Sequence, residues 1–114
     1  MTRISSSPED ARESIALSGS TDYVSPEQIL GTAADPASDI YALGCVAYEC
    51  LTGSVPFPGR SEMEVLFAHM QHEPPRPSDV QSELDRRLDN VTAKAMAKEP
   101  AERYANGAEL VGAL

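Results

Sequence analysis

The stretch DIYALGCVAYECL, residues 39–51, decides the fold. Charged side chains occur in it only at Asp39 and Glu49, and apolar side chains occupy every face of the corresponding helical wheel. A helix with this pattern is normally packed against other elements on all sides. The Thr52-Gly53 pair that follows is a helix stop signal. The stretch therefore predicts a central helix over about 39–51, with the other elements packed around it.

A short helix is predicted before the central one. Ser25 and Pro26 supply a cap and a first helical position, and Gly31 follows as a helix end. The segment 32–38 is expected to be a loop. Residues 1–24 are polar and carry no sustained apolar period, so no packed element is predicted there.

Three more helices are predicted after the central one. Ser61 and Glu64 form a capping box that starts the first of them, which extends to about residue 72. Apolar residues recur in it at i, i+3, i+4 and i+7 and predict its buried stripe. They are Met63, Leu66, Phe67 and Met70. The second helix is expected over about 83–97, and the third follows an Asn106 cap. Because no strand-like alternation occurs, the sequence predicts an all-α fold.

The composition excludes several classes of protein. The 114 residues are 41% hydrophobic and 24% charged, which suits one small globular domain or part of a larger one. Eighteen acidic and nine basic side chains give a net charge of −9. This charge disfavours nucleic acids and anionic membranes as partners. No apolar run approaches the roughly 18 residues of a membrane helix, and the N-terminus lacks the apolar core of a secretory signal.

The two cysteines, Cys45 and Cys50, lie five residues apart in the central stretch. On a helix their side chains do not stack on one face, so a disulfide between them is not expected. We expect both to be buried and reduced, and the chain to be cytoplasmic.

Two local patterns admit a functional and a plain structural interpretation. His69 and His72, with Glu73 beside them, would suit a metal ion, but no third ligand of matching geometry is evident, and a solvated helix face is the simpler interpretation. The proline-rich stretch 74–77 would suit a polyproline ligand for an SH3-like domain. A connection between two helices is the simpler interpretation there.

Four separated pieces of the sequence resemble one family. GSTDYVSPE (residues 19–27) is similar to the end of a protein kinase activation segment, and DIYALGC (39–45) to the start of the kinase F helix. LTGSVPF (51–57) fits the loop that leads to helix G, and PAERY (100–104) the element before the last helix of the large lobe. In this order and spacing they cover about 19–114. The chain thus resembles the C-terminal half of the large lobe of a bacterial, eukaryotic-like Ser/Thr kinase.

The resemblance implies roles for the N-terminal residues. In the family, the matching end of the activation segment positions the protein substrate, and the matching residues here are Ser20, Thr21 and Tyr23. Ser14 lies where related kinases carry an activating phosphate, although a solvated loop serine is the simpler interpretation. Residues 1–18 are expected to be a mobile region similar to an activation segment, preceding a truncated kinase-like lobe over 19–114.

Three charged residues are expected to be structural by the same resemblance. The family pairs the glutamate that matches Glu27 with the arginine that matches Arg103, in a bridge that holds the activation segment on the lobe. The aspartate that matches Asp39 accepts hydrogen bonds from backbone amides of the catalytic loop. A buried carboxylate requires such partners, because without them its burial costs several kcal/mol.

The sequence departs from the family in its catalytic motifs. It contains no Gly-x-Gly-x-x-Gly, no His-Arg-Asp and no Asp-Phe-Gly, and its two lysines are Lys94 and Lys98, late in a predicted helix. Those motifs position ATP and its metal ions in a kinase. We therefore assign no catalytic, cofactor-binding or metal-binding residue in this chain; ATP and Mg²⁺ belong to the full-length family.

Three functional hypotheses remain. The first is a fragment of a Ser/Thr kinase domain that is inactive alone, with Met1 as an internal codon or the start of a remnant. The second is a non-catalytic interaction module that uses the helix over about 62–72. The third is a helical domain that matches the motifs by chance. Under the first two, the partner is a protein: the rest of a kinase domain, another kinase or a regulator. In the family, the helix that matches 39–51 packs against the catalytic loop and helix E, which this sequence does not contain, so part of its apolar face is expected to be open to solvent. Marginal stability, self-association or a covering partner is the expected consequence.

Overall fold

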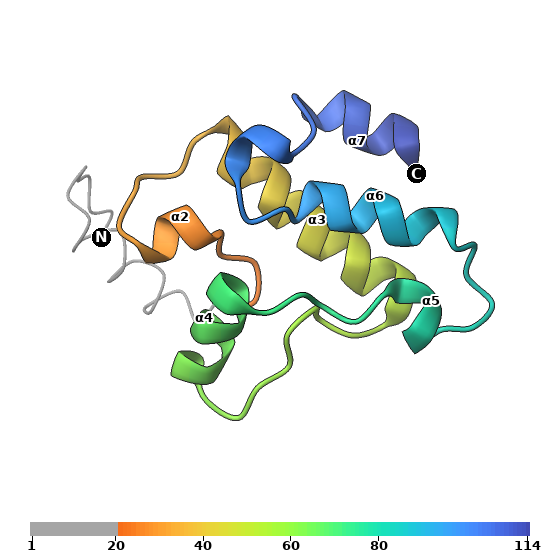
Figure 1. Cartoon of the computed structure of the whole chain (residues 1–114), viewed down its shortest axis with the longest axis horizontal. Helices are drawn as coiled ribbons and strands as arrows, with labels where there is room; N and C mark the ends of the chain where they lie inside the picture. The colour runs from red at the N-terminus through yellow and green to blue at the C-terminus, as the bar shows by residue number, and fades with distance from the viewer. Residues whose placement is uncertain (1–20) are drawn as a thin grey trace, which may run out of the picture.

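The computed structural model describes residues 21–114. Between these residues all regular structure is helical and no strand occurs, which confirms the predicted all-α class. Figure 1 shows α3 crossing the middle of the molecule, with α2 and α4 toward one end, α5 toward the other, and α6 and α7 alongside. In chain order the elements are α2 (Pro26–Ile29), α3 (Pro36–Thr52), α4 (Glu62–Gln71), α5 (Pro77–Val80), α6 (Arg87–Ala95), the 3-10 turn η1 (Pro100–Glu102) and α7 (Gly107–Ala113).

The central helix begins earlier than its apolar stretch. Asp35 caps it by accepting from the Ser38 backbone N–H at 2.9 Å, and the Ser38 hydroxyl oxygen accepts from the Asp35 N–H at 2.7 Å. Pro36 follows as the first helical residue. The prediction of a loop over 32–38 was therefore wrong at its end, because a proline next to an aspartate also starts a helix. At the other end, Gly53 closes the helix with a φ of 81°, a conformation that suits glycine.

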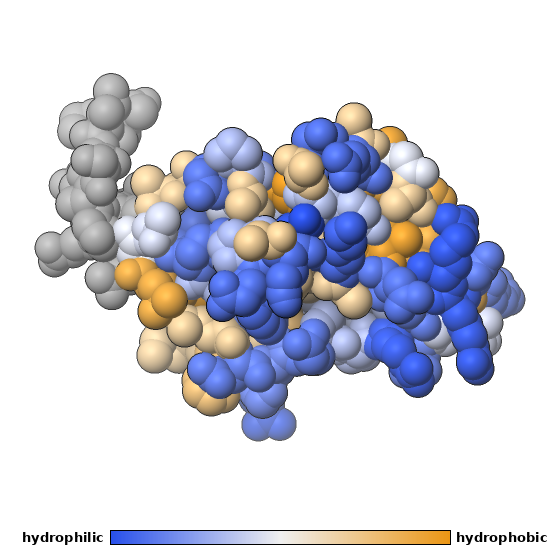
Figure 2. All heavy atoms as spheres, turned by 45° about the horizontal axis from the view of Figure 1, so that its top comes forward, coloured by the Kyte–Doolittle hydropathy of each residue, from blue (hydrophilic) through white to orange (hydrophobic). Residues whose placement is uncertain are grey.

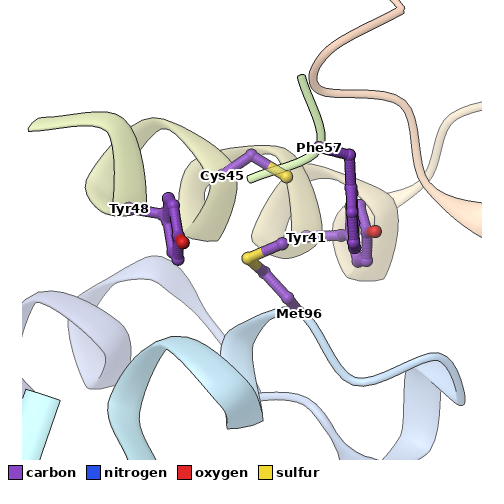
Figure 3. Packing of buried hydrophobic residues seen from close by; sticks show 5 residues of the cluster. All are labelled: Tyr41, Cys45, Tyr48, Phe57 and Met96. Carbon is purple, nitrogen blue, oxygen red and sulfur yellow. The ribbon is translucent and has the colours of Figure 1, made fainter. Parts of the chain in front are cut away.

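One side of α3 forms the hydrophobic core. Tyr41, Cys45 and Tyr48 project from it and pack with Phe57 and Met96 (Figure 3). A second cluster joins α3 to α6 and α7 through Ile40, Val91, Ala95 and Leu110.

The close approach of α3 and α6 depends on a glycine. A Cβ added at Gly44 would lie 2.7 Å from the Cβ of Ala95, which is closer than two carbon atoms can pack. Glycine at this position therefore lets the two helix backbones meet.

The opposite side of α3 is not covered by residues 21–114. Leu43 is 37% and Val46 42% exposed, and Asp39 and Cys50 are exposed on the same stripe. The prediction that both cysteines are buried was wrong for Cys50, although both are free thiols. The open stripe agrees with the expectation that part of the apolar face over 39–51 lacks its neighbours in this chain.

The buried face of α4 differs from the predicted one. Val65 and His69 are buried, whereas Met63 is 75% and Phe67 60% exposed. The predicted apolar stripe therefore lies largely on the outer side. The buried face of α4 is the one that carries His69, whose ring is hydrogen-bonded to Tyr41. The spacing of apolar residues alone does not predict this face.

The start of α4 carries the expected serine cap in an altered form. The Ser61 hydroxyl oxygen accepts from the Glu64 N–H at 3.2 Å. The Glu64 carboxylate accepts from the N–H of Arg60 at 3.2 Å, one residue before the cap, so the reciprocal half of the predicted box is shifted.

The helix predicted over 83–97 is shorter in the structure. It begins at Arg87, and a separate turn of helix, α5, begins at Pro77. The two are joined by Asp89, whose carboxylate accepts from the backbone N–H and the hydroxyl of Ser78 at 2.9 and 2.6 Å. The proline-rich stretch before α5 is a connection, and the Tyr48 hydroxyl donates to the carbonyl of Pro75 at 2.7 Å. Asn106 caps α7 as predicted.

Candidate functional site

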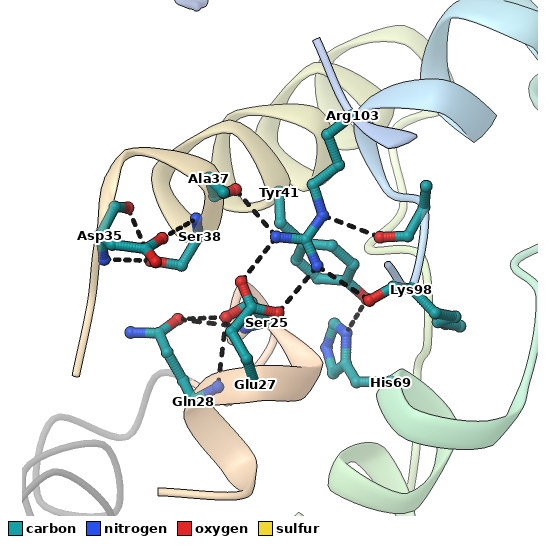
Figure 4. Close-up of polar contacts among 11 residues, drawn as sticks. Ser25, Glu27, Gln28, Asp35, Ala37, Ser38, Tyr41, His69, Lys98 and Arg103 are labelled. Atoms are coloured by element: carbon teal, nitrogen blue, oxygen red, sulfur yellow. Dashed lines mark hydrogen bonds and ion pairs between the residues drawn. The ribbon is translucent and has the colours of Figure 1, made fainter. Parts of the chain in front are cut away.

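The segment from residue 21 to α2 is anchored to the lobe by a buried ion pair. Arg103 donates from its two terminal nitrogens to the Glu27 carboxylate at 2.6 and 2.8 Å, although the two residues are 76 positions apart (Figure 4). The side chain of Arg103 is 0% exposed and that of Glu27 14%. A bidentate pair of this kind fixes geometry as well as charge.

The guanidinium of Arg103 has further partners that satisfy its remaining donors. It donates to the carbonyls of Ala97 at 2.8 Å, Ala37 at 2.9 Å and Lys98 at 3.2 Å. Its central carbon lies 4.9 Å from the centre of the Tyr41 ring. One side chain therefore joins α2, the first turn of α3 and the chain after α6.

The Glu27 carboxyl group of this pair is ionised at neutral pH. Burial alone would raise the pKa of Glu27, but the hydrogen bond and the positive charge of Arg103 outweigh it, and the pKa is lowered overall. Glu27 is thus a carboxylate that is held ionised, as an anchor requires.

The short helix α2 is built as the sequence predicts. The Ser25 hydroxyl oxygen accepts from the Gln28 N–H, and the Gln28 side chain accepts from the Ser25 N–H at 3.1 Å, which makes a full capping box. Pro26 is its first residue, and Gly31 follows with a φ of 102°. This rigid turn places the Glu27 carboxylate toward Arg103.

Tyr23 has a partner that the sequence analysis missed. Its hydroxyl donates a hydrogen bond to a carboxylate oxygen of Glu49 on α3. This bond, together with partial burial, raises the pKa of Tyr23 to about 12. In the sequence, Glu49 stands out only as one of the two charges of the central stretch. An acid in the middle of an otherwise apolar helix is itself the signal that a polar partner is nearby.

The remaining candidates fall in three places. Thr21, the first residue of the segment, is buried at 7% exposure. Asp39 is exposed in the first turn of α3, and no hydrogen bond or ion pair joins its side chain to residues 21–114. Ser14, Ser20 and the whole region 1–18 lie outside the described residues.

The histidine predicted to lie on a solvated face is in fact in the core. His69 is 0% exposed, and its Nδ1 lies 2.7 Å from the Tyr41 hydroxyl oxygen. The edge of its ring packs on Phe57 with 4.9 Å between ring centres. Burial and then the charge of Lys98 lower its pKa to about 4, so it is neutral at pH 7. Within residues 21–114 no three metal-binding side chains come together.

The uncovered side of α3 forms one wall of an apolar groove. The groove has a volume of about 350 Å³ and lies between α3, α6 and α7. Figure 2, in which the top of Figure 1 comes forward, shows hydrophobic surface at the right of the molecule between hydrophilic side chains. The wall residues include Leu43, Val46 and Cys50 of α3, and Leu88, Leu110 and Val111 opposite.

Comparison with known proteins agrees with this arrangement. The family model for the protein kinase domain matches residues 4–110. The chain is 42% identical over 107 residues to the serine/threonine-protein kinase PknB of Mycobacterium tuberculosis, covering 94% of this chain and 17% of that protein. It is 44% identical over 106 residues to the probable serine/threonine-protein kinase CE0033 of Corynebacterium efficiens, covering 90% of this chain and 16% of that protein.

The chain belongs to the protein kinase domain family, and its relatives are bacterial serine/threonine kinases. It spans about a sixth of the length of these relatives. Its all-helical architecture is that of part of a kinase large lobe. In the part of the chain that the structure describes, no helix is long and apolar enough to cross a membrane.

Proposed function

We propose that this chain is the substrate-positioning part of a serine/threonine kinase catalytic domain and that it does not transfer phosphate by itself. The observation that carries this proposal is the bidentate Glu27–Arg103 pair, which fixes the segment beginning at Thr21 against the lobe. Tyr23, bound to Glu49, holds the same segment on α3. Phosphoryl transfer requires that the protein substrate is held in position and that ATP and its metal ions are bound.

The groups that bind ATP and magnesium are expected from residues outside this sequence. The chain lacks the glycine-rich, His-Arg-Asp and Asp-Phe-Gly motifs that hold ATP and its magnesium ions. The exposed stripe of α3, with an acid at one end and Leu43 and Val46 along it, suits a protein surface laid over it. We place the rest of a catalytic domain there, and we expect the chain to work in the cytoplasm without nucleic acid.

A chimera tests this function directly. In the catalytic domain of the Mycobacterium tuberculosis relative, the 107 matched residues are replaced by those of this chain. The chain alone is expected to bind no ATP, and the chimera to phosphorylate a protein substrate. A matched chimera with Arg103→Ala is expected to bind ATP and lose most of the transfer. A folded, ATP-binding chimera that transfers no phosphate would contradict the proposal.

A second candidate function rests on the outer surface of α4. Met63 and Phe67 are largely exposed there, and Phe67 borders a hollow of about 280 Å³ that Phe57 and Pro75 also line. Large exposed apolar side chains beside a hollow are typical of protein-binding surfaces. The chain would then act as a non-catalytic module that docks a kinase or a regulator.

The two candidates are separated by a binding experiment. The second predicts that the immobilised chain retains a purified serine/threonine kinase and that Phe67→Ser abolishes retention. Leu30→Ser is the matched control, because Leu30 is 68% exposed but lies outside the α4 surface. Equal retention by both variants would exclude the docking function of α4.

A further inference from the structure

A buried histidine of α4 is hydrogen-bonded to the central helix. His69 comes from α4, and its Nδ1 lies 2.7 Å from the hydroxyl oxygen of Tyr41 on α3. The ring is 0% exposed and is also packed against Phe57. A fully buried imidazole is expected to use both of its nitrogens, because an unpaired buried polar group costs free energy.

The hydrogen bond with Tyr41 selects one neutral form of this imidazole. A neutral imidazole carries one N–H and one acceptor nitrogen, and the neighbours decide which is which. If Nδ1 accepts from the Tyr41 hydroxyl, the proton is on Nε2. In the opposite arrangement the tyrosine hydroxyl hydrogen would lack an acceptor, because His69 is the only hydrogen-bond partner of that hydroxyl among residues 21–114.

The second ring nitrogen, Nε2, also requires a partner. Within the described part of the chain, Nε2 is buried and completes no hydrogen bond of acceptable geometry. The backbone groups of Asp22 and Thr21 favour a proton on the ring. The positive charge of Lys98 disfavours a second proton on the ring. A donor at Nε2 facing backbone acceptors is the arrangement that these surroundings stabilise.

We propose that His69 is a positioning residue for the segment that begins at Thr21: its buried, otherwise unpartnered Nε2–H is directed at the backbone carbonyls of Thr21 and Asp22, and the Tyr41 hydroxyl holds the ring in that tautomer. The inference rests on the proposed function only in assigning the segment to substrate. The hydrogen-bonded arrangement itself is a property of the 114-residue chain. His69 thus holds the segment at a fixed position relative to α3, at a point separate from the Glu27–Arg103 anchor.

Nuclear magnetic resonance of the histidine nitrogens tests the tautomer. The chain contains two histidines, so ¹⁵N-histidine labelling gives two ring systems, and a His72→Gln variant assigns them. At pH 7 we expect a fixed Nε2–H form for His69, and an exchanging mixture for the exposed His72. An Nδ1–H form or a charged ring at position 69 would overturn the proposal.

Variants of His69 test the positioning role. His69→Gln keeps an N–H donor near the place of Nε2, whereas His69→Asn places its amide near Nδ1. We expect backbone order parameters over 22–24 to stay near the rigid value of about 0.85 in His69→Gln and to fall toward about 0.6 in His69→Asn and Tyr41→Phe. Values are compared with α6 of the same variant, so that a general loss of stability does not count. Equal values in the two His69 variants would overturn the proposal.

Failure of this inference is distinguishable from failure of the proposed function. The tautomer and order parameters are measured on this chain without ATP. In the active chimera, His69→Asn is expected to raise the KM for a protein substrate about tenfold with little change in kcat, and an unchanged KM would also overturn the positioning role. A chimera that is inactive with either residue refutes the kinase function and leaves the spectroscopic result to decide the arrangement.

Discussion

The two sides of α3 carry similar residues and have different surroundings. On one side, Tyr41, Cys45 and Tyr48 are at most 1% exposed and are packed by Met96, which directly follows α6, and by Phe57 in the loop between α3 and α4. On the other side, Leu43 and Val46 are exposed next to an apolar groove. Both sides are apolar, so the difference lies in the partners rather than in the helix. A helix apolar all round indicates neighbours on every side, and residues 21–114 supply them on one.

The largest expected effect is that of replacing Arg103, which lies over the Tyr41 ring on the covered side of α3. Arg103→Ala leaves the Glu27 carboxylate buried without its partner and removes contact with Tyr41. We expect a loss of about 3–5 kcal/mol in the free energy of unfolding, measured by urea denaturation. Arg76→Ala is the matched control, because its pair with Asp79 is exposed, and we expect a loss below about 1 kcal/mol. Equal losses would show that the anchor is not part of the core.

The next effect is a dependence on pH. His69 has a pKa of about 4 when folded, against an ordinary value of 6.5, because burial and Lys98 disfavour its charged form. Between these values the unfolded chain binds more protons, so stability falls as the pH decreases from 6.5 toward 4, by about 3 kcal/mol in total. Urea denaturation at several pH values measures this. The control His72→Gln is expected to keep this dependence and His69→Gln to lose it; a wild-type chain equally stable at pH 6.5 and 4.5 would contradict it.

A smaller effect is expected where α3 meets α6. Gly44→Ala introduces a methyl group 2.7 Å from the Cβ of Ala95, and overpacking of this kind costs about 1–3 kcal/mol. Gly112→Ala is the matched control in α7, where a Cβ meets nothing within 4 Å. There we expect a gain of about 0.5–1 kcal/mol, because alanine favours helix. Thermal unfolding of both variants measures the difference, and a stabilised Gly44→Ala chain would mean that the helices are not in contact there.

The smallest effect on stability is expected on the uncovered side. Val46→Ser should change the free energy of unfolding by less than about 0.5 kcal/mol, because the side chain is already partly in water. It should nevertheless reduce self-association in sedimentation and the binding of dyes to apolar surface. Val80→Ser is the control, with a similarly exposed valine outside the groove. A wild-type chain that is monomeric and binds no dye would contradict the view that this side requires a partner.

Much of the fold was predictable because the signals are local. The serine cap and proline start of α2, the Asn106 cap of α7 and the glycine end of α3 each depend on side chains within a few residues of one another. The start of α3 at Pro36 was missed although its signal is also local, because aspartate and proline favour loops as well as helix starts.

The candidate site was predictable only in part. Pairing Glu27 with Arg103 came from the family resemblance, since nothing in the spacing of two residues 76 positions apart requires them to meet. The bond from Tyr23 to Glu49 and the burial of His69 were missed. Both depend on which side of a helix faces inward, and apolar periodicity gave the wrong side for α4.

The sequence by itself determined where helices form, that no strand is expected, and that the chain lacks the motifs for ATP, because each is written in neighbouring residues. The tertiary structure decided which face of α4 is buried, which side of α3 is left open, and how Arg103 gathers three separate elements. The physical reason is that burial and pairing are settled between segments distant in sequence. A charged or polar side chain enters the core only where another segment supplies its partner.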